Sequence, residues 1–268
     1  MPETRNPEQF PNASRIMDHF LGGSENFAVD RAAAEGIVKV LPGAPIGARS
    51  NRRFLARAVR TATRRGIKQF LDLGSGIPAA DAPHEVAPEA KVVYVDNDPV
   101  VRDIALRILG GSASGRTAYV DADFRDVEAV LSAPATKELL DFSQPMAVLL
   151  SAVLHFVGDA GDPYGIIERY KAPLAPGSLV ILTHTSYDYV SAPVQVATDE
   201  LYGRFRVELA PRSRAEITRF VDTEGWTVLE PGVVSTNEWG SPEEPPSDAD
   251  HQTNRQDAAG FAAVAVKH

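Results

Sequence analysis

The chain has 268 residues, 44% of them hydrophobic, and a formal net charge of −9. A chain of this size can bury one substantial core, and its acidic balance argues against a general nucleic-acid binder, which needs a basic face to neutralise phosphates. Because the chain has no cysteine, disulfides, thiolate metal sites and a cysteine nucleophile are excluded.

The first 66 residues carry three helix patterns. Asn12 and Ser14 can cap a helix with apolar residues at positions 16, 17, 20 and 21, and Gly22–Gly23 ends it. Further helices are predicted from about 27 to 40 and from 48 to 65, the last with an arginine-rich face that we expect to be solvated. We interpret 1–66 as a helical extension on a domain of residues 67–268, either a lid over a site or an ordinary surface helix group. The polar residues that could close such a site are Arg15, Asp18, His19, Asn26 and Asp30.

From residue 68 onward, strand and helix patterns alternate, which predicts parallel strands joined by right-handed crossovers. The predicted strands are 69–73, 91–96, 117–121, 145–150, 178–184, 226–230 and 260–266. The predicted helices are 80–87, 99–109, 126–132, 163–173 and 213–222, and 185–206 is partly helical. Trp226 is predicted to lie in the core and Trp239 on the surface, within a polar segment, 237–257, that is expected to be disordered or a surface excursion.

The first predicted strand ends in a glycine-rich turn. The run QFLDLGSGIP (69–78) has apolar residues around one carboxylate, Asp72, and breaks at Gly74 and Gly76. Glycines let the backbone approach a ligand closely. A carboxylate inside a strand is costly unless it is hydrogen-bonded or faces a ligand, so Asp72 either contacts loop amides or contributes to a site.

The next strands also end in polar residues. Asp96 follows the second strand and lies 20 residues after Gly76, the position of an acid that accepts the hydroxyl groups of a ribose. Asp123 follows the third strand and Ser151 the fourth. Since parallel strands share one carboxyl edge, the pattern predicts a nucleoside site, although the glycine turn alone also fits a dinucleotide-binding enzyme.

The chain resembles the class I S-adenosylmethionine-dependent methyltransferases, and more narrowly the actinobacterial S-adenosyl methyltransferase family once catalogued as a domain of unknown function. The narrower resemblance rests on RIMDHFLGGSENFAVDR (15–31), YVDNDP (94–99), AVLHF (152–156) and DPYG (162–165), and extends over nearly the whole chain. It implies a Rossmann-like α/β fold with a mostly parallel seven-stranded sheet and helices on both faces. It also implies S-adenosyl-L-methionine as the cofactor.

The resemblance assigns a part of the cofactor to each strand end. It implies that Asp72, Gly74, Ser75 and Gly76 hold the methionine end, Asp96 with Asn97 the ribose, Asp123 and Phe124 the adenine, and Ser151, Ala152 and Val153 the region around the sulfonium.

His155 is the candidate general base, because it lies four residues after Ser151 and an imidazole can remove a proton from oxygen or nitrogen. Beside Leu154 and Phe156 it could instead be a packed core residue. Tyr164, Tyr187 and Tyr189 could line an acceptor pocket or pack internally. The histidines lack metal-ligand spacing, so no metal site is expected.

We therefore predict a methyltransferase acting on oxygen or nitrogen of a small molecule. The alternatives are a non-catalytic S-adenosylmethionine-binding regulatory module and, less favoured, an NAD(P)-dependent oxidoreductase. No run reaches the roughly 18 apolar residues of a membrane span, and residues 1–10 lack the apolar segment of a secretion signal. We therefore expect a cytoplasmic protein with no membrane or nucleic-acid partner, and no pattern indicates an oligomeric state.

Overall fold

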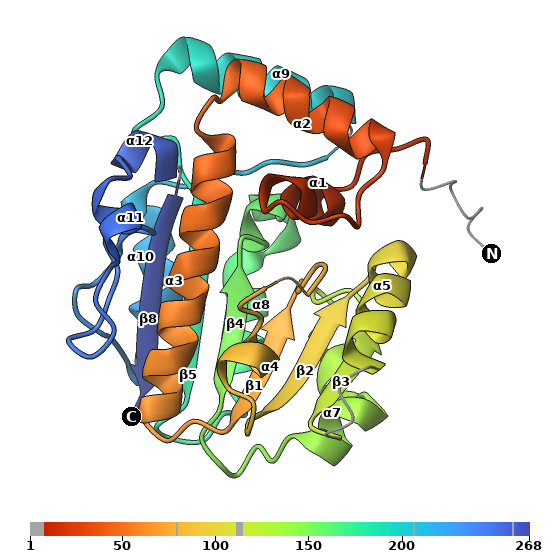
Figure 1. Cartoon of the computed structure of the whole chain (residues 1–268). Coiled ribbons are helices and arrows are strands. Elements are labelled where there is room, and N and C mark those ends of the chain that lie inside the picture. The colour runs from red at the N-terminus through yellow and green to blue at the C-terminus, as the bar shows by residue number, and fades with distance from the viewer. Residues whose placement is uncertain (1–7, 79, 111–114, 206, 259) are drawn as a thin grey trace.

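The computed structural model describes residues 8–78, 80–110, 115–205, 207–258 and 260–268. Its central element is one sheet with the strand order β3-β2-β1-β4-β5-β8-β6, and β7 also pairs with β8 (Figure 1). The strands are β1 (Gln69–Leu73), β2 (Lys91–Asp96), β3 (Thr117–Asp121), β4 (Ala147–Ser151), β5 (Leu179–Thr185), β6 (Trp226–Val228), β7 (Val234–Ser235) and β8 (Gly260–Lys267).

The sheet is mostly parallel. Strands β1 to β5 pair in parallel, whereas β8 runs antiparallel to β5 and to the short strands β6 and β7. The predicted α/β fold is confirmed, and the seven strands along the sheet correspond to those predicted from the sequence. The two-residue strand β7 is additional and was too short to give a sequence signal.

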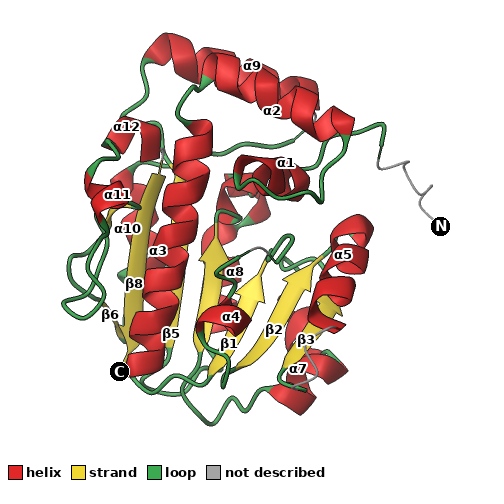
Figure 2. Ribbon diagram, in the orientation of Figure 1, coloured by secondary structure: helices red, strands yellow, loops and turns green. Residues whose placement is uncertain are grey.

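Helices cover both faces of the sheet (Figure 2). They are α1 (Ala13–Phe20), α2 (Ala28–Val40), α3 (Ala44–Arg64), α4 (Pro83–Val86), α5 (Pro99–Gly110), α6 (Val127–Ser132), α7 (Pro134–Leu139), α8 (Pro163–Lys171), α9 (Ala192–Phe205), α10 (Arg214–Val221), α11 (Asp248–His251) and α12 (Arg255–Ala258), with short 3₁₀ turns at Leu154–Phe156 and Asp159–Gly161. Ser213 caps α10 in a capping box with Glu216. None of the helices in the described part of the chain is long and apolar enough to cross a membrane.

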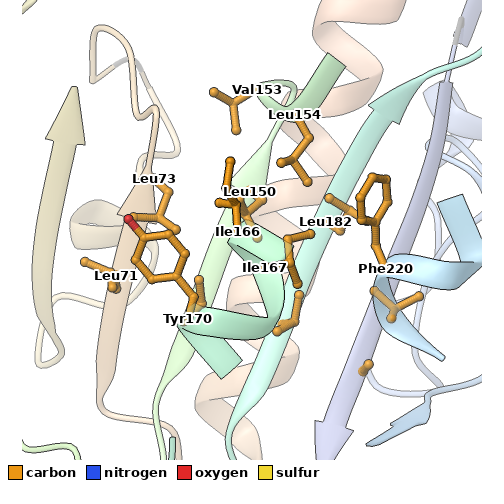
Figure 3. Close-up of a cluster of buried hydrophobic side chains, with 14 of the residues drawn as sticks. Leu71, Leu73, Leu150, Val153, Leu154, Ile166, Ile167, Tyr170, Leu182 and Phe220 are labelled. Atoms are coloured by element: carbon orange, nitrogen blue, oxygen red, sulfur yellow. The ribbon is translucent and has the colours of Figure 1, made fainter. Parts of the chain in front are cut away.

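Alternate residues of each central strand enter separate cores, because side chains along a strand point to opposite faces. Phe70 and Leu149 pack with Phe54 of α3 in one cluster. Leu71 and Leu150 belong to the other cluster, which contains residues of α8 and α10 (Figure 3). This two-sided burial explains why the strands read as continuous apolar runs in the sequence.

Helices α1, α2 and α9 lie across the carboxyl ends of the parallel strands (Figure 1). A buried ion pair joins α1 to α2, since Arg15 Nε donates to Asp30 Oδ2 over 2.7 Å and both side chains are almost fully covered. Asp30 also accepts hydrogen bonds from the backbone amides of Asn12 and Phe27. Arg15 and Asp30 therefore brace these helices against each other.

The expectations for the C-terminal polar segment were wrong. Residues 237–257 contain α11 and α12, and the buried carboxylate of Asp250 pairs with Arg53 and Arg57 of α3 over 2.7 and 2.6 Å. Trp239 is fully buried, with its ring 5.3 Å from that of Phe54, centroid to centroid. The arginine face of α3 is thus largely an interface rather than a solvated surface. The partners of Arg53 and Arg57 at Asp250 lie more than 190 residues away in sequence, where no local pattern could reveal them.

Candidate functional site

A cavity of about 840 Å³ lies at the carboxyl edge of the sheet, beneath α1, α2 and α9. Its wall has two parts, which we call the cofactor half (the segments that follow β1, β2, β3 and β4) and the lid half (α1, α2, α9 and residues 207–209). Every site residue predicted from the sequence lines this one cavity, namely Asp72, Gly74, Ser75, Gly76, Asp96, Asn97, Asp123, Phe124, Ser151, Ala152, Val153 and His155. The structure thus brings together residues separated by more than 80 positions.

The turn after β1 requires both of its glycines. Gly74 and Gly76 have φ values of 63° and 61°, a region that residues with a Cβ rarely adopt. A Cβ on Gly74 would collide with the side chain of Val153, and one on Gly76 would lie 3.1 Å from Ser14 Oγ. The turn therefore packs closely against the β4 loop and against α1.

Asp72 is a buried carboxylate that accepts no hydrogen bond from the described residues. Its side chain lines the cavity and is 5% exposed. Burial raises its pKa to about 7, partly opposed by Arg52 and reinforced by Asp96. An uncompensated buried carboxylate is costly, so this position favours a cationic ligand group.

Arg52 and Asn51 of α3 also line the cavity, and the sequence reasoning missed both. Arg52 Nε donates to Ala80 O over 2.8 Å, and its charge acts on Asp72. Burial lowers the pKa of Arg52, an effect opposed by Asp72. Asn51 Nδ2 donates to Ser151 Oγ over 3.1 Å. Helical spacing offered one signal, because Arg52 falls off the stripe formed by Arg53, Arg57, Arg60 and Arg64.

Asp96 lies at the end of β2 and is held by two backbone amides. Gly76 N donates to Asp96 Oδ2 over 2.9 Å, and Asp98 N donates to Oδ1 over 3.0 Å. Burial raises the pKa of Asp96, and these two hydrogen bonds oppose the rise. Each carboxylate oxygen can accept a further hydrogen bond, so Asp96 can still bind a diol.

Asp123 follows β3 and is paired. The Arg125 backbone amide donates to Asp123 Oδ1 over 2.9 Å, and the Arg125 guanidinium also binds the carboxylate. Burial would raise the pKa of Asp123, but the hydrogen bonds from Arg125 outweigh it and the pKa is lowered. Asp123 therefore remains ionised, beside the partly buried ring of Phe124.

The loop after β4 carries a strained residue. Ala152 has φ 55°, a left-handed conformation that is uncommon for a residue with a Cβ, and its amide donates to Thr183 Oγ1 over 2.8 Å. Strain of this kind persists where surrounding contacts over-determine it, commonly at functional sites. Here the contact with β5 fixes the backbone between Ser151 and Val153.

His155 lies in the cavity wall and is 6% exposed. Burial lowers its pKa to about 3, with further lowering from His184 and Arg212. Its Nδ1 atom has no hydrogen-bond partner in the described part of the chain. His155 is therefore neutral near pH 7, and it is a weaker base than the unperturbed imidazole assumed from the sequence.

His184 cannot act as a free base, because both of its ring nitrogens have partners. Arg212 can only donate, so His184 Nε2 accepts from Arg212 Nη1 over 3.1 Å, and Nδ1 then donates to Thr185 O over 2.8 Å. Of the three candidate tyrosines, Tyr187 lines the cavity, whereas Tyr164 stacks on Phe220. Among the described residues, no group of three His, Asp or Glu side chains could hold a metal ion.

The strand order, the antiparallel strand β8 and the acid at the end of β2 define a class I, Rossmann-like methyltransferase fold. The model of a family described as S-adenosyl methyltransferase matches residues 3–268, and the chain belongs to this family. It is an S-adenosylmethionine-dependent enzyme. No curated protein is significantly similar in sequence.

Two solved structures resemble this one closely. A DUF574 family protein from Streptomyces avermitilis is 34% identical with a TM-score of 0.88, over 97% of this chain and 99% of that chain. A candidate methyltransferase from Thermobifida fusca is 36% identical with a TM-score of 0.85, over 97% and 96%. The S-adenosylmethionine-dependent methyltransferase SibL, at 17% identity and a TM-score of 0.53 over 97% of this chain and 64% of that chain, shares the fold alone.

Proposed function

We propose that the protein transfers the methyl group of S-adenosylmethionine to an oxygen or nitrogen atom of a small molecule. The observation that carries the proposal is the buried Asp72 carboxylate, which accepts no hydrogen bond from the described residues and lines the cavity together with Arg52. The Asp72 carboxylate suits the ammonium group of the methionine end of the cofactor, and the Arg52 guanidinium suits its carboxylate. The nicotinamide dinucleotides offer no such ammonium group to Asp72.

The other residues of the cofactor half fit the rest of the molecule. In this proposal Asp96 accepts the ribose hydroxyls, and Asn97 lies beside it. Asp123 and Phe124 contact the adenine, the first by hydrogen bonding and the second by its ring. Residues 151–153 flank the sulfonium, with Gly74 and Gly76 allowing the β1 turn to approach closely.

The cofactor supplies an electrophilic methyl group, so the chain mainly has to orient the acceptor and exclude water. In this proposal, α1 and α2 of the extension 1–66, together with α9, form a lid over the domain 67–268. Neutral His155 can accept a hydrogen bond from the acceptor nucleophile and orient it toward the methyl group. With its lowered pKa, His155 does not store the proton, which passes on to water.

The proposal takes the acceptor to be a small molecule and the place of action to be the cytoplasm. The net charge of −9 supports a small-molecule acceptor, because a nucleic-acid substrate would require a basic face.

Cofactor binding and turnover test the proposal. S-adenosylhomocysteine at about 100 times its Kd should stabilise the protein by about 2.7 kcal/mol, whereas NAD should leave the melting temperature unchanged. Formation of S-adenosylhomocysteine in the presence of a small-molecule fraction of a cell extract then measures transfer. Tight binding of the cofactor without product from any fraction would contradict methyl transfer to a small molecule and favour a regulatory module.

A further inference from the structure

The lid half of the cavity differs in chemistry from the cofactor half. The side chains that line it are mainly apolar and come from α1, α2, α9 and the segment after α9. Representative members are Met17, Phe20, Val40, Val194, Tyr202 and Leu209. These side chains face a cavity rather than the packed core, so the space they enclose suits an apolar molecule.

Several polar groups in and beside this half have partners within the chain. Asp18 Oδ2 accepts from the Glu25 amide and from Asn26 Nδ2, each over 2.8 Å. The Tyr187 hydroxyl donates to Asp199 Oδ1 over 2.7 Å, and Thr198 Oγ1 donates to Val194 O over 2.8 Å. A sugar or a peptide entering here would leave its hydroxyl or amide groups without hydrogen bonds, which is costly.

The charges that line the lid half are unfavourable for an anion. Asp18 lines it from α1, and Asp257 of α12, outside the lid half, lines the same cavity, where Asn254 Nδ2 donates to its carboxylate. His155 and His184 are neutral at pH 7, because burial lowers the pKa of each, to about 3 and about 4. Among the described residues of the lid half, no Lys or Arg side chain lines the cavity, so a carboxylate or phosphate held under this wall would meet like charge there.

Polar atoms gather instead at the junction of the two halves. Asn51 and Ser151 bond each other there, and Thr183, Ser186 and Thr236 line the same region. An acceptor with its apolar body under the lid would place its nucleophile among these groups. The arrangement matches a molecule with one polar end.

We infer that the methyl acceptor is a mainly apolar small molecule that carries no negative charge and presents a single nucleophilic group to the floor near Ser151. The inference rests on the proposed function and names the substrate class of the same site. It goes beyond that function by specifying the polarity and charge of the acceptor, because a methyltransferase of this fold could equally accept an anionic or a highly polar substrate.

Two naphthalene derivatives of similar size and different charge, with phenol as a smaller comparison, test the inference. The full-length protein, saturated with S-adenosylhomocysteine, is titrated at pH 7.5 by calorimetry with 2-naphthol, 2-naphthoate and phenol. We expect 2-naphthol to bind at least tenfold more tightly than either 2-naphthoate, which adds a negative charge, or phenol, which lacks one ring. Equal affinity for 2-naphthol and 2-naphthoate, or no binding of 2-naphthol, would overturn the inference.

A pair of substitutions on α9 locates the binding surface. Val194 lines the cavity, whereas Val196 on the same helix is 58% exposed and does not. Val194→Asp should weaken 2-naphthol binding at least tenfold, and Val196→Asp should change it less than twofold. If Val194→Asp no longer folds, the isosteric Val194→Thr replaces it and should weaken binding at least threefold. Unchanged affinity in the Val194 variant would overturn the inference.

Binding of S-adenosylhomocysteine distinguishes a failure of the proposed function from a failure of the acceptor class alone. Both valine variants should retain the stabilisation by S-adenosylhomocysteine, because neither residue belongs to the cofactor half. Failure of the wild-type protein to bind S-adenosylhomocysteine would overturn the proposed function and this inference together. Retained cofactor binding with no preference for 2-naphthol would overturn the acceptor class alone.

Discussion

The two halves of the cavity are built in different ways. Residues of the cofactor half lie within a few positions of the ends of β1 to β4, so strand pairing alone brings them together. Residues of the lid half come from α1, α2 and α9, and their positions depend on packing between distant helices. The positions of the cofactor half thus follow from local sequence and sheet register, whereas those of the lid half depend on contacts between segments far apart in the sequence.

The largest effect should come from breaking the lid. Asp30→Ala removes the carboxylate that pairs with the buried Arg15 guanidinium, and with it two hydrogen bonds to backbone amides. Removing one member of a buried ion pair costs about 3–5 kcal/mol, so the free energy of unfolding in urea should fall by that amount. The matched control, Glu200→Ala, breaks an exposed pair with Arg204 on α9 and should cost less than about 0.5 kcal/mol. Equal losses in the two variants would show that the ion pair does not brace the lid.

The next effect should appear in the cofactor half. Asp96→Ala removes a carboxylate that would bind two ribose hydroxyls, and hydrogen bonds to charged groups contribute about 1.5–3 kcal/mol each. We expect the affinity for S-adenosylhomocysteine, measured by calorimetry, to fall about 100-fold or more. Asp121→Ala, at the exposed end of β3 where the carboxylate pairs with Arg102, is the control and should bind normally. A normal affinity in Asp96→Ala would place the ribose elsewhere.

The sequence was sufficient for the cofactor half because its signals are local. Apolar runs of strand length, two glycines and an acid after each strand mark Asp72, Asp96 and Asp123 directly. The parallel pairing of β1 to β5 agrees with the alternation of strands and helices. Asp72 could be recognised as unusual from the sequence alone, because a carboxylate in a buried strand is costly unless it is hydrogen-bonded or faces a ligand.

The sequence was insufficient where the contacts are long-range. Asn51 and Arg52 reach the site only because α3 packs along the sheet, on the face toward which Asp72 points. The burial of Trp239 and Asp250 depends on arginines nearly 200 residues earlier. A polar, proline-rich composition suggested disorder for 237–257, but ion pairs with α3 supply partners that composition does not reveal.

His155 should also make the protein sensitive to acid. Its pKa is lowered from 6.5 to about 3 in the folded state, so the unfolded chain binds more protons between these values. Stability is therefore lost as the pH falls below about 6.5, by about 2 kcal/mol between pH 7 and pH 5 for this residue. His155→Gln should remove that part of the loss in urea titrations at both pH values. His251→Gln, on the exposed surface, should follow the wild-type curve.

The smallest effect should come from Asp72→Asn, which should stabilise the protein without ligand but weaken its binding of S-adenosylhomocysteine. Burial raises the pKa of Asp72 from 3.8 to about 7, so the folded state holds the proton more tightly and loses stability as the pH rises from about 4 to 7. At pH 8 the variant Asp72→Asn is free of the buried charge, although the buried amide offsets part of the gain at a cost of about 1–3 kcal/mol. We expect a net stabilisation of about 1 kcal/mol without ligand, measured by urea unfolding, together with a reduced gain on adding S-adenosylhomocysteine. Asp121→Asn should change neither quantity, since its carboxylate is exposed. A loss of stability in Asp72→Asn would mean that the carboxylate is compensated within the protein, and the cofactor half would then no longer be a site kept ready for a cation.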